Sequence, residues 1–225
     1  MTRPTSAMIF AAGFGTRMGH LTAKTPKPMV ELGGEPMIAR TIRLLREAGI
    51  ERIVANTHYL AEVIEPYLHA YGVTTVREEP AILETGGGLK AALAYLGDGA
   101  VITINPDGLW LGQNPVCTLL DAWRPEMNAL LLLADPKRTF GSASTGDFSL
   151  KDGLIARNGP HVYSGAQIID PSRLHEIEAD AFSLNLYWDL LALNQPLAGA
   201  VHDGPWCDIG NPEGLILAEG MAARD

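Results

Sequence analysis

The chain has 225 residues, a hydrophobic content of 47% and a formal net charge of -9. This length fits one large domain or two small ones, and the hydrophobic content is ample for a buried core. The acidic balance, without any segment rich in Lys or Arg, argues against an extended nucleic-acid surface, and no apolar run reaches the roughly 20 residues of a membrane span. The first residues lack the features of a secretory signal, so a soluble cytoplasmic protein is expected.

Strands and helices are predicted to alternate from the start of the chain to residue 135. Strands are predicted over 6–12, 52–57, 73–78, 100–107 and 128–135, and helices over 36–49, 61–72, 88–97 and 114–123. Gly49 is expected to close the first helix, and Pro66 to interrupt or bend the second. Alternation with short connections predicts an α/β fold, with a Rossmann-like, mostly parallel sheet covered by helices on both faces.

Beyond residue 135 the pattern changes to shorter β segments separated by Gly and Asp. We predict a hairpin over 140–159, a strand over 161–170, helices over 171–177 and 183–195, a strand and turn over 201–210, and a closing helix over 212–224. These segments make the sheet mixed. No linker or internal repeat appears, so one domain is predicted over 1–225, with a first half to about residue 135 and a smaller, β-rich half over about 136–225.

Metal sites built from Cys or His are not indicated. Cys117 and Cys207 lie far apart without a CxxC spacing, which predicts neither a disulfide framework nor a zinc site. The six histidines show no pair at metal-ligand spacing. Any metal would therefore have to be held by carboxylates.

The first strand runs into the sequence AAGFGTRM, in which Gly13 and Gly15 precede Arg17. A glycine loop at the carboxyl end of a strand lets backbone N–H groups approach a phosphate. Lys27 follows between Pro26 and Pro28, which fix the backbone that aims it. Arg offers a planar fork and Lys a compact charge, so the pair could hold a triphosphate at two points.

AAGFGTRM followed by KTPKPM resembles the signature of the sugar-1-phosphate nucleotidyltransferases. Three more stretches match that family's motifs in order: LETGGGL at 83–89, INPDGLW at 104–110 and WCDIGNPE at 206–213. The resemblance implies that a nucleoside triphosphate and a sugar 1-phosphate react to a nucleotide sugar and pyrophosphate. It assigns the nucleotide to the first half and the sugar to the second.

Within that family, LETGGG, GDF at 146–148 and YSG at 163–165 are most similar to the bacterial N-acetylmuramate-1-phosphate uridylyltransferases of cell-wall recycling. The resemblance therefore favours UTP as the nucleotide and N-acetylmuramate 1-phosphate as the acceptor. A monomer or a small homo-oligomer is expected.

The resemblance also implies a role for each matched residue. Asp107 and Asp208 are the implied ligands of Mg²⁺, a hard cation that takes carboxylate oxygens. Arg17 would contact the β- and γ-phosphates, and Lys27 the α-phosphate. The other nucleotide-binding residues implied are Ala11, Ala12, Gly13, Gly15, Thr16, Gly86, Gly87 and Asn105. Gly86 and Gly87 are expected to let the second loop approach the base or ribose closely.

Two features depart from the family pattern. Pro106 stands between Asn105 and the metal Asp107, where relatives commonly carry a small residue, and proline removes an N–H and fixes φ. The chain also lacks the Glu-Lys pair with which many relatives hold the sugar. The sugar-binding residues expected instead are Tyr163, Ser164 and Gly165, with Glu84 and Asp147 as candidate acceptors for sugar hydroxyls.

Three functions stay open from the sequence. The first is the uridylyltransferase. The second keeps the chemistry but uses GTP with mannose or heptose 1-phosphate, since the glycine loops and aspartates are shared and Glu78 or Glu79 could accept from guanine. The third, prompted by Pro106, is a nucleotide-sensing protein with little turnover.

Overall fold

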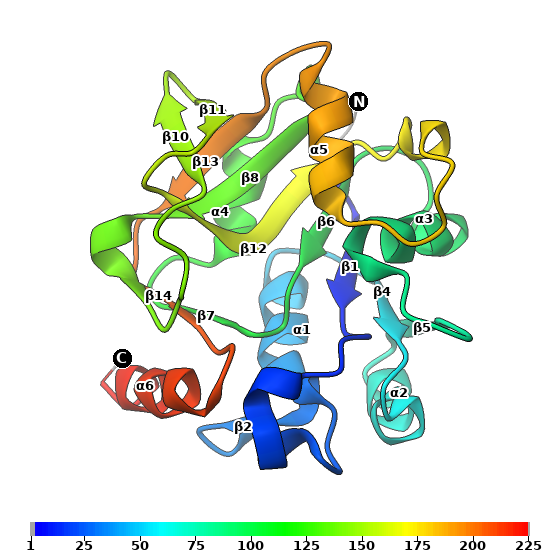
Figure 1. The fold of residues 1–225 in the computed structure, drawn as a ribbon, viewed down its shortest axis with the longest axis vertical. Coiled ribbons are helices and arrows are strands. Elements are labelled where there is room, and N and C mark those ends of the chain that lie inside the picture. Colours follow the sequence, from blue (N-terminus) through cyan, green and yellow to red (C-terminus); the bar gives the residue numbers. More distant parts are fainter. Residues whose placement is uncertain (1–2, 225) are drawn as a thin grey trace.

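The structure, a computed structural model, describes residues 3–224 and is built on one large sheet (Figure 1). In chain order, the strands of this sheet are β1 (Ser6–Phe10), β4 (Arg52–Thr57), β5 (Thr74–Arg77), β6 (Val101–Ile104), β8 (Ala129–Ala134), β10 (Phe148–Lys151), β11 (Leu154–Arg157), β12 (Val162–Ile169) and β13 (Ala198–His202). Their spatial order is β10-β11-β13-β8-β12-β6-β1-β4-β5. The predicted α/β class with a mixed sheet is confirmed.

The sheet has a parallel part and an antiparallel part. Strands β6, β1, β4 and β5 run parallel to one another. β12 runs antiparallel to both β6 and β8, so it joins the two predicted halves of the chain within one sheet. β13 is parallel to β8, and β10 and β11 form the predicted hairpin at the far edge.

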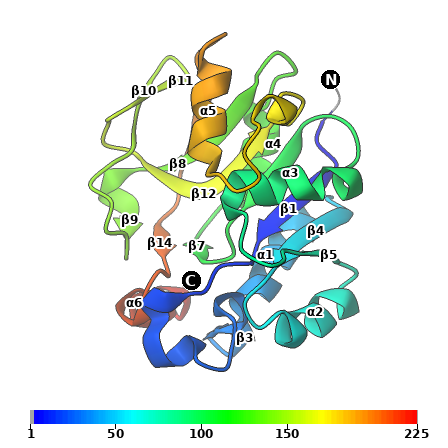
Figure 2. The same ribbon diagram turned by 45° about the vertical axis from the view of Figure 1, so that its right-hand side comes forward.

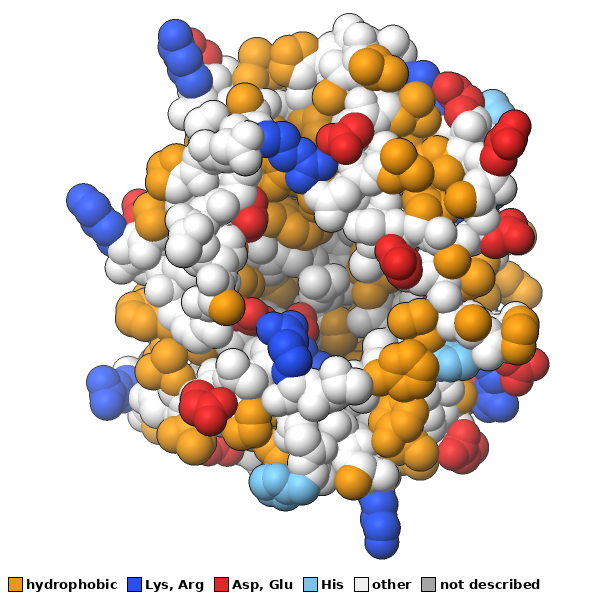
Figure 3. All heavy atoms as spheres, in the orientation of Figure 1, with side chains coloured by type: hydrophobic (Ala, Val, Ile, Leu, Met, Phe, Trp, Pro, Cys, Tyr) orange, Lys and Arg blue, Asp and Glu red, His pale blue; other side chains and the backbone are white. Residues whose placement is uncertain are grey.

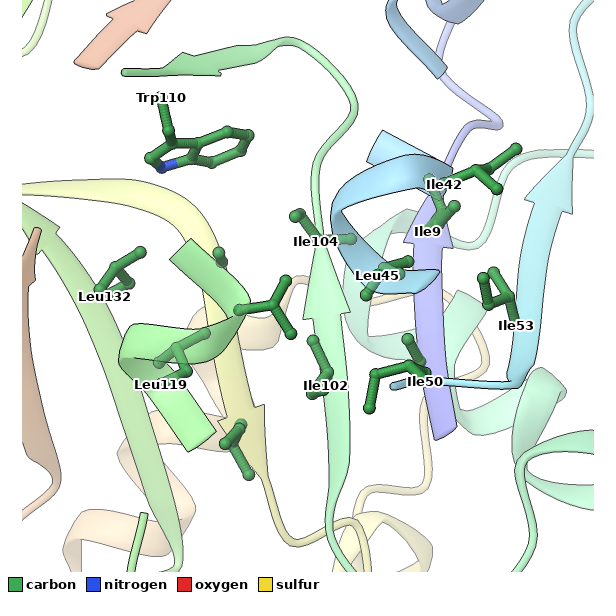
Figure 4. Close-up of a cluster of buried hydrophobic side chains, with 14 of the residues drawn as sticks. Ile9, Ile42, Leu45, Ile50, Ile53, Ile102, Ile104, Trp110, Leu119 and Leu132 are labelled. Atoms are coloured by element: carbon green, nitrogen blue, oxygen red, sulfur yellow. The ribbon is translucent and has the colours of Figure 1, made fainter. Parts of the chain in front are cut away.

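Helices cover both faces of the sheet, as Figures 1 and 2 show. α1 (Met37–Glu47), α2 (Ala61–Ala70) and α4 (Pro115–Ala122) lie on one face, and α3 (Glu84–Leu96) and α5 (Leu184–Ala192) lie on the other. The alternation of side chains along each strand explains the two layers. On β1, Ile9 packs into the cluster of α1, α2 and α4 (Figure 4), whereas Met8 packs into the cluster of α3 and α5.

A third apolar cluster lies beside the sheet. It brings together a small sheet of order β7-β14-β9, the closing helix α6 (Pro212–Ala222) and the hairpin of β2 (Glu31–Leu32) and β3 (Glu35–Pro36). The small sheet consists of β7 (Gly108–Trp110), β9 (Thr139–Phe140) and β14 (Trp206–Asp208). Its pairing sets Asp208 opposite Gly108, next to Asp107 along the chain.

Several predicted elements differ from the structure. α3 begins at Glu84 rather than at 88, and α2 continues through Pro66 without interruption. Only the short 3-10 helix η4 (Leu174–Glu176) forms where a helix over 171–177 was predicted. The predicted strand and turn over 201–210 is the end of β13 and the separate strand β14, which belong to different sheets.

The strand order indicates where a ligand-binding crevice lies. From β1 the chain moves outward through β4 to β5 and then returns to place β6 on the other side of β1. Ligands of open α/β sheets bind at the carboxyl ends of strands where the order reverses in this way. Among residues 3–224, no helix is both long enough and apolar enough to cross a membrane.

Candidate active site

A cavity of about 460 Å³ opens where β1 and β6 end. Its wall includes residues at or just after the carboxyl ends of all four parallel strands. The lining residues are Phe10, Ala11, Ala12, Gly13, Gly15, Thr16, Arg17, Lys27, Pro28, Asn56, Glu78, Ile82, Glu84, Thr85, Asn105, Pro106, Asp107, Ser183 and Gly210. The face drawn in Figure 3 is hollowed at its centre, and charged side chains of both signs stand at the rim. The cavity thus joins both expected cations to most of the expected nucleotide-binding residues.

The glycine loop is shaped by a close approach to Lys27. Gly15 has φ 63, and a Cβ added to it would lie 2.8 Å from the Cβ of Lys27. Glycine is required there because it alone combines a positive φ with that proximity. The hydroxyl of Thr22 donates to the Gly15 carbonyl at 3.0 Å, and the 3-10 helix η1 (Thr16–Thr22) begins directly after the glycine. The loop therefore presents Arg17 and Lys27 to one cavity.

A buried network of polar side chains is hydrogen-bonded to the glycine loop. The backbone N–H of Ala11 donates to Asn56 Oδ1 at 2.8 Å, and Asn56 Nδ2 donates to Glu78 Oε1 at 2.7 Å. The other carboxylate oxygen of Glu78 accepts from the N–H of Leu83 at 2.7 Å, just before α3 begins. Asn56 and Glu78 thus tie the glycine loop to the second loop. Sequence reasoning missed Asn56, although a polar residue near the end of a parallel strand is a usable signal.

The two aspartates of the implied metal site lie on neighbouring segments. The N–H of Ile209 donates to the Asp107 carbonyl at 2.8 Å, which holds the segment after β14 against the segment after β6. The ammonium of Lys27 pairs with the Asp107 carboxylate. A Cβ added at Gly210 would lie 3.0 Å from the guanidinium of Arg17, so Arg17 packs on the turn that follows Asp208.

Burial and neighbouring charges shift the pKa of Asp208. Burial raises the pKa of its carboxyl above the ordinary value, the charge of Asp107 raises it further, and Lys27 and Arg17 oppose the rise. Within residues 3–224, no group of three or more His, Cys, Asp or Glu side chains is arranged to hold a metal. The two carboxylates fit a divalent cation that takes its remaining oxygens from substrate and water, because a cation would relieve the repulsion between them.

A second cavity of about 280 Å³ adjoins the first. The two share Phe10, Thr85, Asn105 and Ser183 in their walls. The second cavity is further lined by Asp147, Phe148, Arg157, Tyr163, Leu184, Asn185 and Trp188. It lies between β10, β11, β12 and α5, in the half of the chain expected to hold the sugar.

Asp147 and Tyr163 line this second cavity, whereas Ser164 and Gly165 act behind it. Asp147 accepts from the N–H of Tyr163 at 2.8 Å, and burial raises the pKa of the Tyr163 phenol. Ser164 is buried and donates to the Leu132 carbonyl at 2.9 Å. Gly165 has φ 84 at an irregularity of β12, and its carbonyl accepts from the N–H of Asn105 at 2.8 Å. Gly165 therefore positions Asn105, which reaches both cavities.

The second glycine stretch does not form the expected open loop. Gly86 and Gly87 lie in the first turn of α3, buried, and both of their N–H groups donate to the Phe182 carbonyl. A Cβ at Gly86 would lie 2.3 Å from the Phe182 ring, so the close approach that needs glycine is made by the protein itself. Among the described residues, this correction leaves Glu84, with φ 58, and Thr85 as the members of LETGGG that line the first cavity.

Sequence reasoning did not single out Ser183, Arg157, Asn185 or Trp188 as site residues. They come from β11 and from the start of α5, segments without a recognisable motif. Trp188 donates from its indole N–H to Gln167 Oε1 at 2.8 Å and stacks edge-on with Tyr163. Only the packing of α5 over β12 brings these side chains to one wall.

Comparisons with known proteins agree with this geometry. The family model described as "MobA-like NTP transferase domain" matches residues 7–199. An N-acetylmuramate alpha-1-phosphate uridylyltransferase of Caulobacter vibrioides is 37% identical, with 98% of each chain covered. The same enzyme of Neisseria meningitidis is 34% identical over 96% of this chain and 97% of its own.

Solved structures share the fold. The crystal structure of HddC from Yersinia pseudotuberculosis aligns with a TM-score of 0.76 at 24% identity, covering 96% of this chain and 99% of HddC. A UDP-glucose pyrophosphorylase complexed with UDP-glucose aligns with a TM-score of 0.80 at 16% identity, covering 98% and 99%. Together with a site that gathers a glycine loop, two cations and two aspartates, these matches show that the chain belongs to the nucleotidyltransferase family with the MobA-like NTP transferase domain.

Proposed function

We propose that this chain transfers a uridylyl group from UTP to N-acetylmuramate 1-phosphate and releases pyrophosphate. The observation that carries the proposal is the adjacency of two cavities that share Asn105 and Thr85. The first offers backbone and cations to a nucleotide, and the second offers aromatic rings and polar groups to a sugar. The Caulobacter and Neisseria uridylyltransferases, which match almost their whole length, support the choice of substrates.

The proposed reaction needs no protein base. The second pKa of a phosphate monoester lies near 6, so an oxygen of the sugar phosphate is already ionised at neutral pH. That oxygen forms a bond to the α-phosphorus while the bond from the α-phosphorus to the bridging oxygen breaks, and pyrophosphate leaves. The part of the chain that the structure describes lines the first cavity without His or Cys, which agrees with this chemistry. Rate enhancement would come from positioning and charge stabilisation.

Lys27 and Arg17 have different proposed tasks. Lys27 lies beside Asp107 and would contact the α-phosphate, where charge rearranges in the transition state. Arg17 packs on Gly210 and would hold the outer phosphates that become pyrophosphate. The backbone from Ala11 to Gly15 would line the nucleotide between them.

Asp107 and Asp208 are the proposed holders of Mg²⁺. Their carboxylates come from neighbouring segments, and the charge of one raises the pKa of the other. Mg²⁺ bound there would neutralise charge on the phosphates. Pro106 lines the first cavity, and the backbone on both sides of it is held. The Asn105 N–H donates to the Gly165 carbonyl, and the Asp107 carbonyl accepts from the Ile209 N–H.

Glu78 gives no support to a guanine site, because its carboxylate is buried and hydrogen-bonded to Asn56 and Leu83. Recognition of guanine by a carboxylate uses both oxygens toward adjacent N–H groups. Both Glu78 oxygens already accept hydrogen bonds, from Asn56 and from Leu83. Glu79 is not among the described residues that line the cavity.

A second candidate keeps the reaction but uses GTP and a neutral sugar. A probable mannose-1-phosphate guanylyltransferase of Oryza sativa is 28% identical, although the match spans only 62% of that longer protein. HddC has also been solved complexed with GMP-PN. Both candidates use the same aspartates and glycine loop, so only substrates separate them.

The test is a substrate panel that reads pyrophosphate release. Four nucleoside triphosphates are combined with the 1-phosphates of N-acetylmuramate, N-acetylglucosamine, mannose and heptose, with Mg²⁺ or with excess EDTA. We expect the highest kcat/KM for UTP with N-acetylmuramate 1-phosphate, and no turnover in EDTA. Higher kcat/KM for GTP with mannose or heptose 1-phosphate would favour the second candidate, and nucleotide binding without pyrophosphate release would favour a sensing protein.

Asp208→Asn separates the metal role from folding. The change keeps the side-chain shape but removes the charge, so kcat is expected to fall more than about tenfold while the circular dichroism spectrum stays unchanged. An unaltered rate would remove Asp208 from the metal site.

A further inference from the structure

The second cavity contains a positive charge that the transfer reaction does not require. Among the described residues that line it, Arg157 is the one cation. It comes from the last position of β11, on the hairpin at the edge of the large sheet. The whole chain carries a formal net charge of -9, so a cation in a cavity wall calls for a physical reason.

Aromatic rings hold the guanidinium over the cavity wall. The Cζ atom of Arg157 lies 5.3 Å from the centroid of the Phe148 ring and 5.5 Å from that of Trp188. Both rings line the same cavity. Stacking on two ring faces fixes the plane of the guanidinium and weakens its hydration, which prepares it for an anionic partner.

Hydrogen bonds also anchor the guanidinium of Arg157, and they use only some of its N–H donors. Nη1 of Arg157 donates to Asn185 Oδ1 at 2.7 Å, and Nη2 donates to Asp189 Oδ1 at 2.8 Å and to the Asn185 carbonyl at 3.4 Å. A guanidinium carries five N–H groups. The Nε–H and one Nη1–H therefore have no acceptor among residues 3–224.

The neighbouring acids leave the charge of Arg157 available. Asp147 lines the cavity and accepts from Ser144 Oγ at 2.9 Å and from the Tyr163 N–H at 2.8 Å, whereas the ion pair of Arg157 is formed with Asp189. Asp189, which pairs with Arg157, is 66% exposed and lies outside the described wall of the cavity. Such an exposed ion pair binds weakly and exchanges readily for a better partner.

We propose that Arg157 binds an acidic substituent of the sugar, so that the enzyme selects acidic sugar 1-phosphates over neutral ones. This inference rests on the proposed function. N-acetylmuramate differs from N-acetylglucosamine by a lactyl ether that ends in a carboxylate, and a planar carboxylate matches the guanidinium fork. Arg157 is thus a specificity residue of the sugar cavity, separate from Arg17 and Lys27 in the nucleotide cavity.

The experiment compares two acceptors that differ only in the lactyl ether with its carboxylate. With UTP and Mg²⁺, kcat/KM is measured for N-acetylmuramate 1-phosphate, and N-acetylglucosamine 1-phosphate is measured both as a substrate and as a competitive inhibitor. Arg157→Met keeps an apolar stem over the two rings but removes the charge. We expect a loss of about tenfold to hundredfold for N-acetylmuramate 1-phosphate, carried mainly by KM, because hydrogen bonds to charged groups are the stronger ones. The inhibition constant of N-acetylglucosamine 1-phosphate is expected to change less than about threefold.

Two control variants separate recognition from folding. Arg157→Lys keeps the charge without the fork and is expected to lose less than Arg157→Met. Arg124→Met changes an arginine whose side chain, among the described residues, hydrogen-bonds only to the carbonyls of Asp121 and Trp123, so both acceptors should behave as with the unchanged chain. Thermal unfolding of each variant checks that the chain remains folded.

The experiment distinguishes a failure of the role proposed for Arg157 from a failure of the proposed function. Equal losses for both acceptors in Arg157→Met, or no loss for either, would overturn the role of Arg157 while the uridylyltransferase stands. A neutral sugar 1-phosphate preferred by the unchanged chain would overturn both the acceptor and the role of Arg157. Preference for a different acidic sugar, lost in Arg157→Met, would overturn the acceptor and support the role of Arg157.

Discussion

At the scale of single residues, the two cations of the first cavity, Lys27 and Arg17, have different surroundings. Lys27 pairs with Asp107 in a half-buried position, whereas Arg17 lies against the turn at Gly210. The two cannot substitute for each other, because one faces the reacting phosphorus in the proposed mechanism and the other faces the leaving group. This difference yields a prediction that separates them.

Lys27→Ala is expected to lower kcat by more than about tenfold and to change nucleotide affinity less, because its proposed contact gains strength in the transition state. Arg17→Ala is expected to weaken binding of UTP as well as turnover, and to leave binding of UMP nearly unchanged, since UMP lacks the outer phosphates. Calorimetric titration with UTP and UMP, beside steady-state kinetics, measures both effects. Equal losses for the two nucleotides in Arg17→Ala would contradict the assignment.

At the scale of secondary-structure elements, the start of α3 is locked to the segment before α5. Gly86 and Gly87 donate to the Phe182 carbonyl, and Phe182 is followed by Ser183, which lines both cavities. The ammonium of Lys90, one turn later, donates to the Ile177 carbonyl at 2.7 Å. Packing between these elements therefore sets the wall that the nucleotide and the sugar would share.

Gly86→Ala tests this lock. The added Cβ would meet the Phe182 ring at 2.3 Å, so we expect unfolding free energy to fall by about 1–3 kcal/mol. The matched control is Gly220→Ala in α6, where a Cβ would meet nothing within 4 Å and where alanine is expected to stabilise by roughly 0.5–1 kcal/mol. Chemical denaturation of both variants measures the two values, and similar values for the pair would contradict the lock.

His202 at the end of β13 supplies a pH-dependent contribution to stability. It is buried, and Nε2 lies 3.0 Å from the Leu111 carbonyl, so Nε2 carries the proton. Nδ1 is buried without a partner among the described residues. Burial lowers the pKa of His202 below its ordinary value of 6.5, so the folded protein keeps the ring neutral.

Below pH 6.5 the unfolded chain therefore binds a proton that the folded chain does not bind, and stability falls as pH falls until the lowered folded pKa is reached. The contribution of this group reaches about 1.4 kcal/mol per pH unit. His202→Gln keeps a donor for Leu111 but does not titrate, so its unfolding free energy should depend less steeply on pH between about 6.5 and 5. Parallel slopes for both proteins would show that His202 is not responsible.

At the scale of the whole molecule, the two halves of the chain share one sheet. β12, from the second half, lies between β6 and β8 of the first and pairs with both. The apolar cluster of α3 and α5 likewise draws residues from both halves. The two halves therefore cannot separate without breaking the strand pairs of β12 with β6 and β8.

We expect one cooperative unfolding transition. The four tryptophans report on both faces of the sheet, because Trp188 lies in the cluster of α3 and α5, whereas Trp110, Trp123 and Trp206 lie in the cluster of α1, α2 and α4. Guanidinium titrations followed by tryptophan fluorescence and by far-UV circular dichroism should give the same midpoint. Separated midpoints would show that the halves unfold independently.

The sequence by itself determined the layered α/β class and singled out the side chains proposed here for the reaction. Both depend on short-range signals: the alternation of apolar residues along β1, the helical spacing along α1, and the spacing from Gly15 to Arg17. These signals act within a few residues, so a linear reading finds them. Lys27 could also be assigned to the same site as the glycine loop, because prolines on both sides fix the backbone of that lysine.

Only the tertiary structure decided what those groups touch. LETGGG forms the start of helix α3 because its glycines admit the Phe182 segment, which lies almost a hundred residues further along the chain and gives no local signal. Asn56 and Glu78 support the glycine loop through a network that spans three strands' ends. Arg157 joins the second cavity because α5 packs over the part of the sheet that contains β11. Such contacts depend on how distant segments pack together. The spacing of residues along the chain does not show which distant segments will meet.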